Sequence, residues 1–307
     1  RAPAATIVWM MMIVGFAVTA ITVGKLLQPY SPERLLDISA SLSVLVVIIT
    51  GLALWGLEGQ ASSVVSADSQ PAHPQNFKQA LASVWNEPQA KAFTVFVFLS
   101  MLAYSAQDLI LEPFAGAVHG FTPGQTTQLS GWHHMGVLIG MLAVAAAGSR
   151  WVAGRLGSVQ AWMVGGCLMS AVATVGLCSA ALSERWPLQA NVVFLGVANG
   201  AFSIAAIATM MRLAGEGGPG REGTRMGLWG SSQAAAFGLG GLVGTAASDL
   251  AHALLGEQRT AYAAVFGMQA LMFAVSAAVA SRLRAGSAQR ASLHFDGPVL
   301  LKGGSSS

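Results

Sequence analysis

Long apolar stretches recur along the chain and are separated by short polar connections. A helix needs about 20 apolar residues to cross the hydrocarbon core of a bilayer, and eight windows of the sequence reach that length. Most windows are hydrophobic on every side, so they are not the one-sided surface helices of a soluble protein. The predicted spans are residues 5–24, 38–57, 92–111, 129–148, 161–180, 192–211, 226–245 and 261–280.

Positive charges alternate between the two sets of connections. Twelve of the sixteen Lys and Arg residues fall in the N-terminus, in the second, fourth and sixth connections, and in the C-terminal tail. Loops rich in Lys and Arg stay on the cytoplasmic side of a membrane. We therefore expect both ends of this chain to be cytoplasmic.

One connection is much longer than the others and divides the chain. Residues 58–91 are polar, but Phe77, Leu81, Val84 and Trp85 repeat at helical spacing, which predicts an amphipathic helix on the membrane surface that ends at Pro88. Two spans precede this connection and six follow it. By analogy, a six-span half after a long cytoplasmic loop is the layout of the major facilitator fold.

The expected fold class is therefore an all-α integral membrane protein with a major facilitator-like bundle. Four parts are predicted: the last two spans of an N-terminal half, a cytoplasmic central loop, a six-span C-terminal half and a polar cytoplasmic tail. These parts are residues 1–57, 58–91, 92–284 and 285–307.

Composition supports a membrane protein and excludes several other classes. Hydrophobic residues make up 54% of the 307 positions and charged residues only 9%, with a net charge of +3. Soluble domains contain about 25% charged residues. An ordinary soluble enzyme, a disordered chain and a nucleic-acid-binding protein are all inconsistent with these values.

Polar residues gather at the end of the third predicted span. Tyr104, Asp108 and Glu112 are spaced four residues apart, so they share one face of a helix. Gln107 precedes Asp108, and Pro113 is expected to end the span. Carboxylates at membrane depth are costly unless paired or hydrated, which makes them candidates for a proton or ligand site. The alternative is that both carboxylates sit at the boundary and reach water.

His133 and His134 lie in the fourth predicted span. Adjacent helical residues point about 100° apart, so the two imidazoles are not expected to share a partner. Each is a candidate axial ligand for a metal, including the magnesium of a chlorin, or a histidine that only bonds between helices. Asn199, Gln233 and Gln269 are further polar residues at depth, which either line a cavity or bond between helices.

Glycine patterns indicate packing rather than catalysis. The run at residues 215–220 matches G-x-G-x-x-G, but it joins two predicted spans instead of following a strand, so we interpret it as a cytoplasmic turn. No cluster has the spacing of a zinc site or of a nucleophile with its base, and no enzyme is expected. Three G-x-x-x-G pairs predict close helix contacts inside the molecule, or alternatively a dimer interface: Gly136/Gly140, Gly196/Gly200 and Gly240/Gly244.

Several stretches resemble one known family in order along the chain. Residues 107–116, QDLILEPFAG, resemble the QDxxLEP(Y/F)(G/A)G signature of the PucC/LhaA family. Residues 26–35, 53–58 and 121–131 resemble the segments that flank its spans. The likeness runs from about residue 5 to residue 284, and it implies an N-terminally truncated member whose first spans lie upstream of Arg1.

The resemblance implies a major facilitator superfamily protein of phototrophic bacteria that helps assemble light-harvesting complexes. Such a protein would insert antenna polypeptides, deliver bacteriochlorophyll, or do both. Its implied partners are the lipid bilayer, antenna polypeptides, and pigment-synthesis enzymes or the insertion machinery, with no nucleic acid. Asp108 and Glu112 would anchor or orient, and His133 or His134 would be the axial ligand. The implied location is a bacterial inner membrane, cytoplasmic or intracytoplasmic, with a cytoplasmic C-terminus.

Two other functions stay open at this point. The chain would instead be a secondary transporter of a small solute or pigment precursor, with Asp108 or Glu112 as the proton-coupling group. A third hypothesis is a truncated chain with no independent function. The sequence upstream of Arg1 separates this last hypothesis from the other two.

Overall fold

The computed structural model describes residues 2–55, 82–148, 158–216 and 222–283, with side chains from Ile7 onward. In these ranges the secondary structure is α-helical, and eight helices are long and apolar enough to cross a membrane. The prediction of an all-α integral membrane protein is confirmed, and each predicted span coincides with one helix. The helices are α1 Ala2–Leu26, α2 Pro32–Leu54, α4 Pro88–His119, α5 Pro123–Ala147, α6 Val159–Leu182, α7 Leu188–Gly215, α8 Glu222–Leu255 and α9 Gln258–Ser281.

Local sequence signals set several helix starts. Pro32, Pro88 and Pro123 each stand in the first turn of a helix, where the missing N–H is not needed. Thr122 and Gln125 form a reciprocal capping box at the start of α5. The predicted amphipathic helix lies mostly outside the described residues, since Phe77 and Leu81 are not among them. The helical residues from Ala82 to Trp85 end just before α4 begins at Pro88.

The expectation that Pro113 ends the third span is wrong, because α4 continues through it to His119. Proline removes one backbone donor, but membrane helices tolerate it when tertiary packing holds the chain in place. Phe114, directly after the proline, is fully buried. Its ring packs edge-on against Phe266 and Tyr262 of α9, with centroids 4.9 and 5.4 Å apart. This contact stabilises the last turns of α4.

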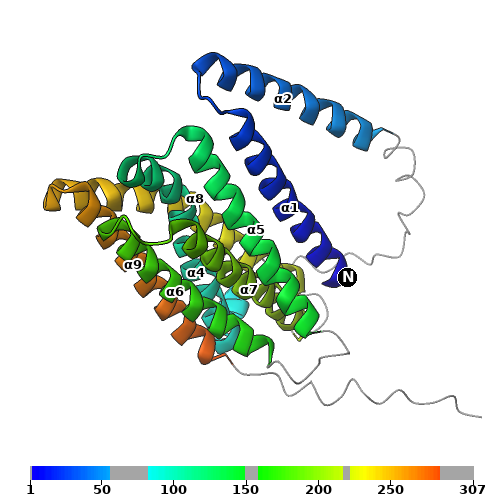
Figure 1. Cartoon of the computed structure of the whole chain (residues 1–307). Coiled ribbons are helices and arrows are strands. Elements are labelled where there is room, and N and C mark those ends of the chain that lie inside the picture. The colour runs from blue at the N-terminus through cyan, green and yellow to red at the C-terminus, as the bar shows by residue number, and fades with distance from the viewer. Residues whose placement is uncertain (1, 56–81, 149–157, 217–221, 284–307) are drawn as a thin grey trace, which may run out of the picture.

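Six helices, α4 to α9, form one bundle, and α1 lies along its α5 side (Figure 1). The most extensive contacts join α5 with α7 and α1, α6 with α9 and α7, and α4 with α8 and α9. By contrast, α2 extends away from the bundle and contains no buried residue (Figure 1). The bundle places α4, α5, α6 and α7 around a common interior, which holds the site described next.

Candidate functional site

A hydrogen-bond network of fully buried side chains joins four helices; we call Gln107, His133, Ser170 and Asn199 the polar network. Ser170 of α6 donates from Oγ to Oδ1 of Asn199 in α7, at 2.8 Å. Asn199 Nδ2 donates to Gln107 Oε1 of α4 at 3.0 Å, and it also lies 3.3 Å from His133 Nε2 of α5. All four side chains have zero exposure. Because buried polar groups must be paired, the network fixes how these helices meet.

A carboxylate adjoins the polar network at His133. Asp108 Oδ1 lies 3.6 Å from His133 Nδ1, and the Asp108 side chain is 34% exposed. His134 completes a group, which we call the His-His-Asp cluster. One ring nitrogen of each histidine and one carboxylate oxygen of Asp108 all lie within 4.8 Å of one another.

The orientation of the His134 ring is set by the backbone of its own helix. His134 Nδ1 lies 2.9 Å from the carbonyl oxygen of Ser130. A carbonyl only accepts hydrogen bonds, so in the neutral ring Nδ1 carries the proton and Nε2 carries the lone pair. On its outer side the ring meets Phe16 of α1 edge-on, with centroids 5.4 Å apart. His134 is therefore buried but keeps one unprotonated nitrogen.

Tyr104, Asp108 and Glu112 share one face of α4, as their spacing predicts, and this face turns toward α5. The centroid of the Tyr104 ring lies 6.1 Å from that of His133, and Glu112, one turn beyond Asp108, lies beside the Ser130 side chain. Glu112 is not part of the His-His-Asp cluster. Asp108 and Glu112, which the sequence analysis could not distinguish, therefore have different surroundings.

The two histidines have different direct partners: His133 meets Asn199 and Asp108, whereas His134 bonds to the Ser130 carbonyl. Their rings nevertheless lie closer together than helical spacing suggests, with centroids 5.3 Å apart and planes inclined by 77°, and both lie near Asp108. Ser170 is the network member that the sequence did not reveal, because nothing distinguishes it from the other serines in the spans. Gln269 is fully buried in α9, outside the polar network.

All three predicted glycine pairs are used inside the molecule. Gly136 and Gly140 of α5 face Gly196 and Gly200 of α7 so closely that an added methyl group would strike backbone atoms of the opposite helix. Gly240 of α8 would similarly meet Ser105 Cβ at 2.6 Å. These pairs are therefore not available as docking surfaces for another helix, and the intramolecular interpretation is confirmed.

A different row of small residues lies open on α8. Gly230, Ala234 and Gly238 are four residues apart, so they share one face, and all three are exposed. A methyl group added at Gly230 or Gly238 would meet no atom of the described chain within 4 Å. We call this row the α8 small face.

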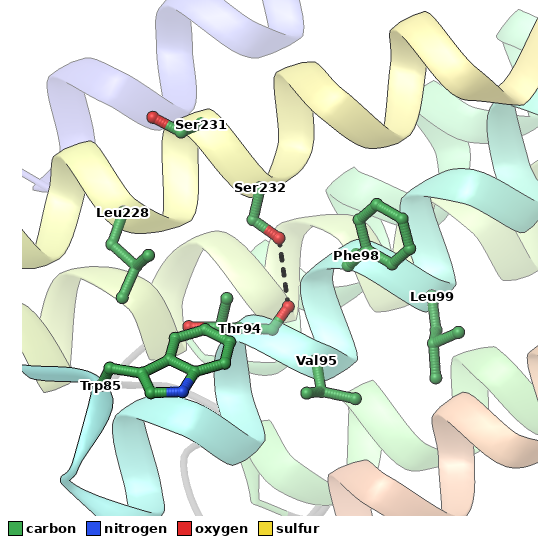
Figure 2. Close-up of a pocket in the computed structure, with 8 residues that line it drawn as sticks. All are labelled: Trp85, Thr94, Val95, Phe98, Leu99, Leu228, Ser231 and Ser232. Atoms are coloured by element: carbon green, nitrogen blue, oxygen red, sulfur yellow. Dashed lines mark hydrogen bonds between the residues drawn. The ribbon is translucent and has the colours of Figure 1, made fainter. Parts of the chain in front are cut away.

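An apolar groove of about 430 Å³ adjoins the α8 small face, between α4 and α8 (Figure 2). Ser232 Oγ donates to the Thr94 carbonyl oxygen at 3.2 Å across the groove. Ser231 lines the groove, and Ala234 of the small face lies three residues further along, next to Ser231 on the helix surface. The full lining is Trp85, Thr94, Val95, Phe98, Leu99, Leu228, Ser231 and Ser232.

Eight membrane-length helices, four of which meet at a buried polar network, define this chain as a multi-pass α-helical membrane protein. The family model described as "PUCC protein" matches residues 1–288. The chain therefore belongs to the PucC family, as the QDxxLEP resemblance predicts.

Two curated relatives from Rhodobacter capsulatus match most of this chain. The chain is 50% identical over 281 residues to a protein named "Bacteriochlorophyll synthase 44.5 kDa chain", covering 92% of this chain and 64% of that protein. It is 27% identical over 284 residues to "Protein PucC", covering 89% of this chain and 59% of the relative. The chain thus spans about three-fifths of the length of these relatives.

The two histidines differ in how well they fit the magnesium of a chlorin. His133 does not fit, because it is fully buried, its Nε2 is taken by Asn199 and its Nδ1 faces Asp108. His134 has a free lone pair in its neutral form, but Asp108 and Phe16 lie close to its ring, and the residue is only 8% exposed. A macrocycle does not fit in this interior.

Proposed function

We propose that this protein is a membrane factor for the assembly of light-harvesting complexes and that it holds a single-span antenna polypeptide against the α8 small face. The observation that carries the proposal is that face: three small residues in one row, open on the outside of the bundle. Small residues at four-residue spacing let two helix backbones approach closely in a membrane, where helices associate mainly through packing.

The groove beside this face supports the same role. Trp85, Phe98 and Leu228 make its lining mostly apolar, so a large side chain of the docked helix could insert there (Figure 2). The names of the relatives, which include PucC and a bacteriochlorophyll synthase chain, direct the proposal toward photosynthetic complexes. Delivery of bacteriochlorophyll, and contact with pigment-synthesis enzymes or the insertion machinery, belong to the proposal on those names alone.

We expect bulky residues on the α8 small face to prevent docking. The double variant Gly230→Leu/Gly238→Leu should lose most of the antenna polypeptide that co-purifies with the protein from a phototrophic host, measured by quantitative mass spectrometry. Absorbance of bound bacteriochlorin, recorded on the same samples, tests pigment delivery separately.

Gly165→Leu is the matched control, because Gly165 of α6 also has no described atom within 4 Å of an added methyl group. This control should keep the antenna polypeptide. Equal co-purification by the wild type and the double variant, with both monodisperse, would contradict docking on α8. Wild-type protein that carries neither antenna polypeptide nor pigment would contradict the assembly role as a whole.

The Asp108–His133 pair favours a second candidate function, a proton-coupled secondary transporter. A carboxylate and an imidazole 3.6 Å apart in the bundle interior are groups that exchange protons. Proteoliposomes loaded with a pH-sensitive dye would report proton entry when a water-soluble porphyrin is added outside. If the protein is such a transporter, Asp108→Asn should abolish this proton entry. Glu184→Gln, which removes an exposed carboxylate, should leave it intact.

A further inference from the structure

We propose that Asp108, His133 and His134 bind one divalent transition-metal ion inside the bundle, a role independent of antenna docking. The three ligand groups come from two neighbouring helices, α4 and α5, and their donor atoms already lie within 4.8 Å of one another. Two imidazoles and one carboxylate suit ions such as Zn²⁺ and Fe²⁺.

Two of these donor atoms have no hydrogen-bond partner among the described residues. His133 Nδ1, on a fully buried ring, and Asp108 Oδ1 face each other at 3.6 Å, beyond hydrogen-bond distance. Buried polar atoms without partners are rare because each one costs free energy. An ion between them would satisfy both atoms at once.

His134 already has the support that a metal-binding histidine needs. Ligating histidines commonly donate their second ring N–H to a backbone carbonyl, which fixes the tautomer and the ring orientation. His134 Nδ1 makes this bond with Ser130, at 2.9 Å. Its Nε2 lone pair is therefore ready for an ion without any change of proton position.

For His133 the supporting residue is Asn199, whose Nδ2 lies 3.3 Å from Nε2. When His133 Nδ1 binds an ion, the ring proton must sit on Nε2, and this N–H then needs an acceptor. A half-turn of the Asn199 carboxamide presents its Oδ1 to that N–H and turns its Nδ2 toward Ser170 Oγ, which can accept. A matching half-turn of Gln107 lets its Nε2, which has no partner among the described residues, donate to Asn199 Oδ1. Asn199 is thus a positioning residue for the site and not a ligand.

Only small movements separate the present geometry from a bound one. Ligand atoms at about 2.0–2.1 Å from a tetrahedral zinc lie roughly 3.3–3.5 Å from each other. The three donor atoms lie within 4.8 Å of one another, and Asp108 and His133 are already 3.6 Å apart, so the remaining closure is chiefly toward His134. Rotation of the His134 and Asp108 side chains can supply it, since the Asp108 side chain is 34% exposed while His133 is enclosed.

The experiment measures metal bound by the whole chain, purified in detergent with a tag that contains no histidine. After removal of metals with a chelator and reloading with Zn²⁺, mass spectrometry of metals should find one Zn²⁺ per chain. Asp108→Asn and His134→Gln should each raise the apparent Kd for Zn²⁺ by at least tenfold, the lower end of the roughly 10–100-fold loss seen when only a supporting residue is removed.

His252→Gln and Glu184→Gln are the controls, because they remove an exposed imidazole and an exposed carboxylate elsewhere in the chain. Both should bind Zn²⁺ like the wild type. Binding that falls equally in the controls, or that is unchanged in Asp108→Asn, would show surface binding and overturn the proposal. So would wild-type protein that binds no Zn²⁺.

A measurement on the wild type covers the case in which a ligand variant fails to fold. X-ray absorption at the zinc edge should show a first shell of nitrogen and oxygen with two imidazole rings. A shell of oxygen alone, or one that contains sulfur, would overturn the assignment. The Gly230→Leu/Gly238→Leu variant should keep its Zn²⁺, so failure of the antenna proposal and failure of the metal proposal are distinguishable.

Discussion

Asn199 connects more of the buried interior than any other side chain in the polar network. Its carboxamide accepts from Ser170 and faces both Gln107 Oε1 and His133 Nε2. Removing it leaves three buried polar groups without their partner. A buried donor or acceptor left unpaired costs about 1–3 kcal/mol, so the network should depend strongly on this one residue.

Asn199→Leu, which keeps the branched shape and the number of side-chain heavy atoms, should therefore unfold at a clearly lower temperature than the wild type. The measurement is thermal unfolding in detergent, followed by loss of monodisperse protein. Ser179→Ala is the control, because Ser179 is partly exposed and its hydroxyl bonds to Val175 of its own helix, so no shift is expected there. Equal melting of Asn199→Leu and the wild type would show that the network adds no net stability.

Most of the buried polar residues could be predicted from the sequence, but the contacts between them could not. Asp108, His133 and Asn199 are conspicuous because polar residues are rare in apolar spans. Which of them meet depends on how α4, α5 and α7 rotate about their axes, and that rotation follows from packing between distant segments. The convergence of His133 and His134 on one carboxylate depends on side-chain rotamers, which helical spacing does not determine.

The contact between α5 and α7 depends on glycine at the element scale. Gly140 packs so closely on Val197 that a Cβ atom at this position would collide with the Val197 backbone carbonyl. A backbone cannot move aside as a flexible side chain can, so the two helices would have to separate. Separation would also pull Asn199 of α7 away from His133 of α5.

Gly140→Ala should consequently lower the thermal stability, whereas Gly267→Ala should leave it unchanged or raise it. Gly267 lies in α9 with no described atom within 4 Å of an added methyl group, and alanine is favoured over glycine in a helix by up to about 1 kcal/mol. The same substitution thus has opposite expected signs at two helical glycines. If both variants melt alike, the close approach of α5 and α7 does not limit stability.

The elements themselves were well predicted, because length and hydropathy alone determine a membrane span. Their ends were less predictable. The turn after Pro113 stays helical because Phe114 packs on α9, and this contact joins residues about 150 positions apart. The packing role of the glycine pairs could be predicted from their spacing. The α8 small face could not, because the sequence does not show which side of α8 is covered by α4.

For the whole molecule, the arrangement of helices fixes which connections share a membrane side. The bundle alternates direction from helix to helix, so residues 183–187 and Glu216, at opposite ends of α7, must lie on opposite sides. At about 1.5 Å per residue, the 28 residues of α7 are longer than the hydrocarbon core is thick. The similarity to the major facilitator fold stays a prediction from the number of spans and the long central loop.

The orientation of the bundle in the membrane also stays a prediction, and it rests on Lys and Arg alone. At the end where α7 meets α8, Arg225 pairs with Glu87 and Arg212 pairs with Glu216, so much of the positive charge there is locally balanced. Acidic residues contribute little to membrane orientation, so these pairs should not weaken the cytoplasmic preference of this end.

Cysteine labelling tests that orientation without altering any charge. With Cys167 and Cys178 replaced by alanine, Ser183→Cys and Gly215→Cys place single thiols at exposed positions on opposite ends of α7. A membrane-impermeant maleimide should label Ser183→Cys in intact spheroplasts, and Gly215→Cys only after the membrane is opened. The reverse pattern would mean that the bundle is inserted in the opposite orientation, so that each end of α4, which carries Asp108, would face the other compartment. Labelling of both thiols in intact spheroplasts would contradict α7 as a membrane span and, with it, the enclosed interior on which the polar network depends.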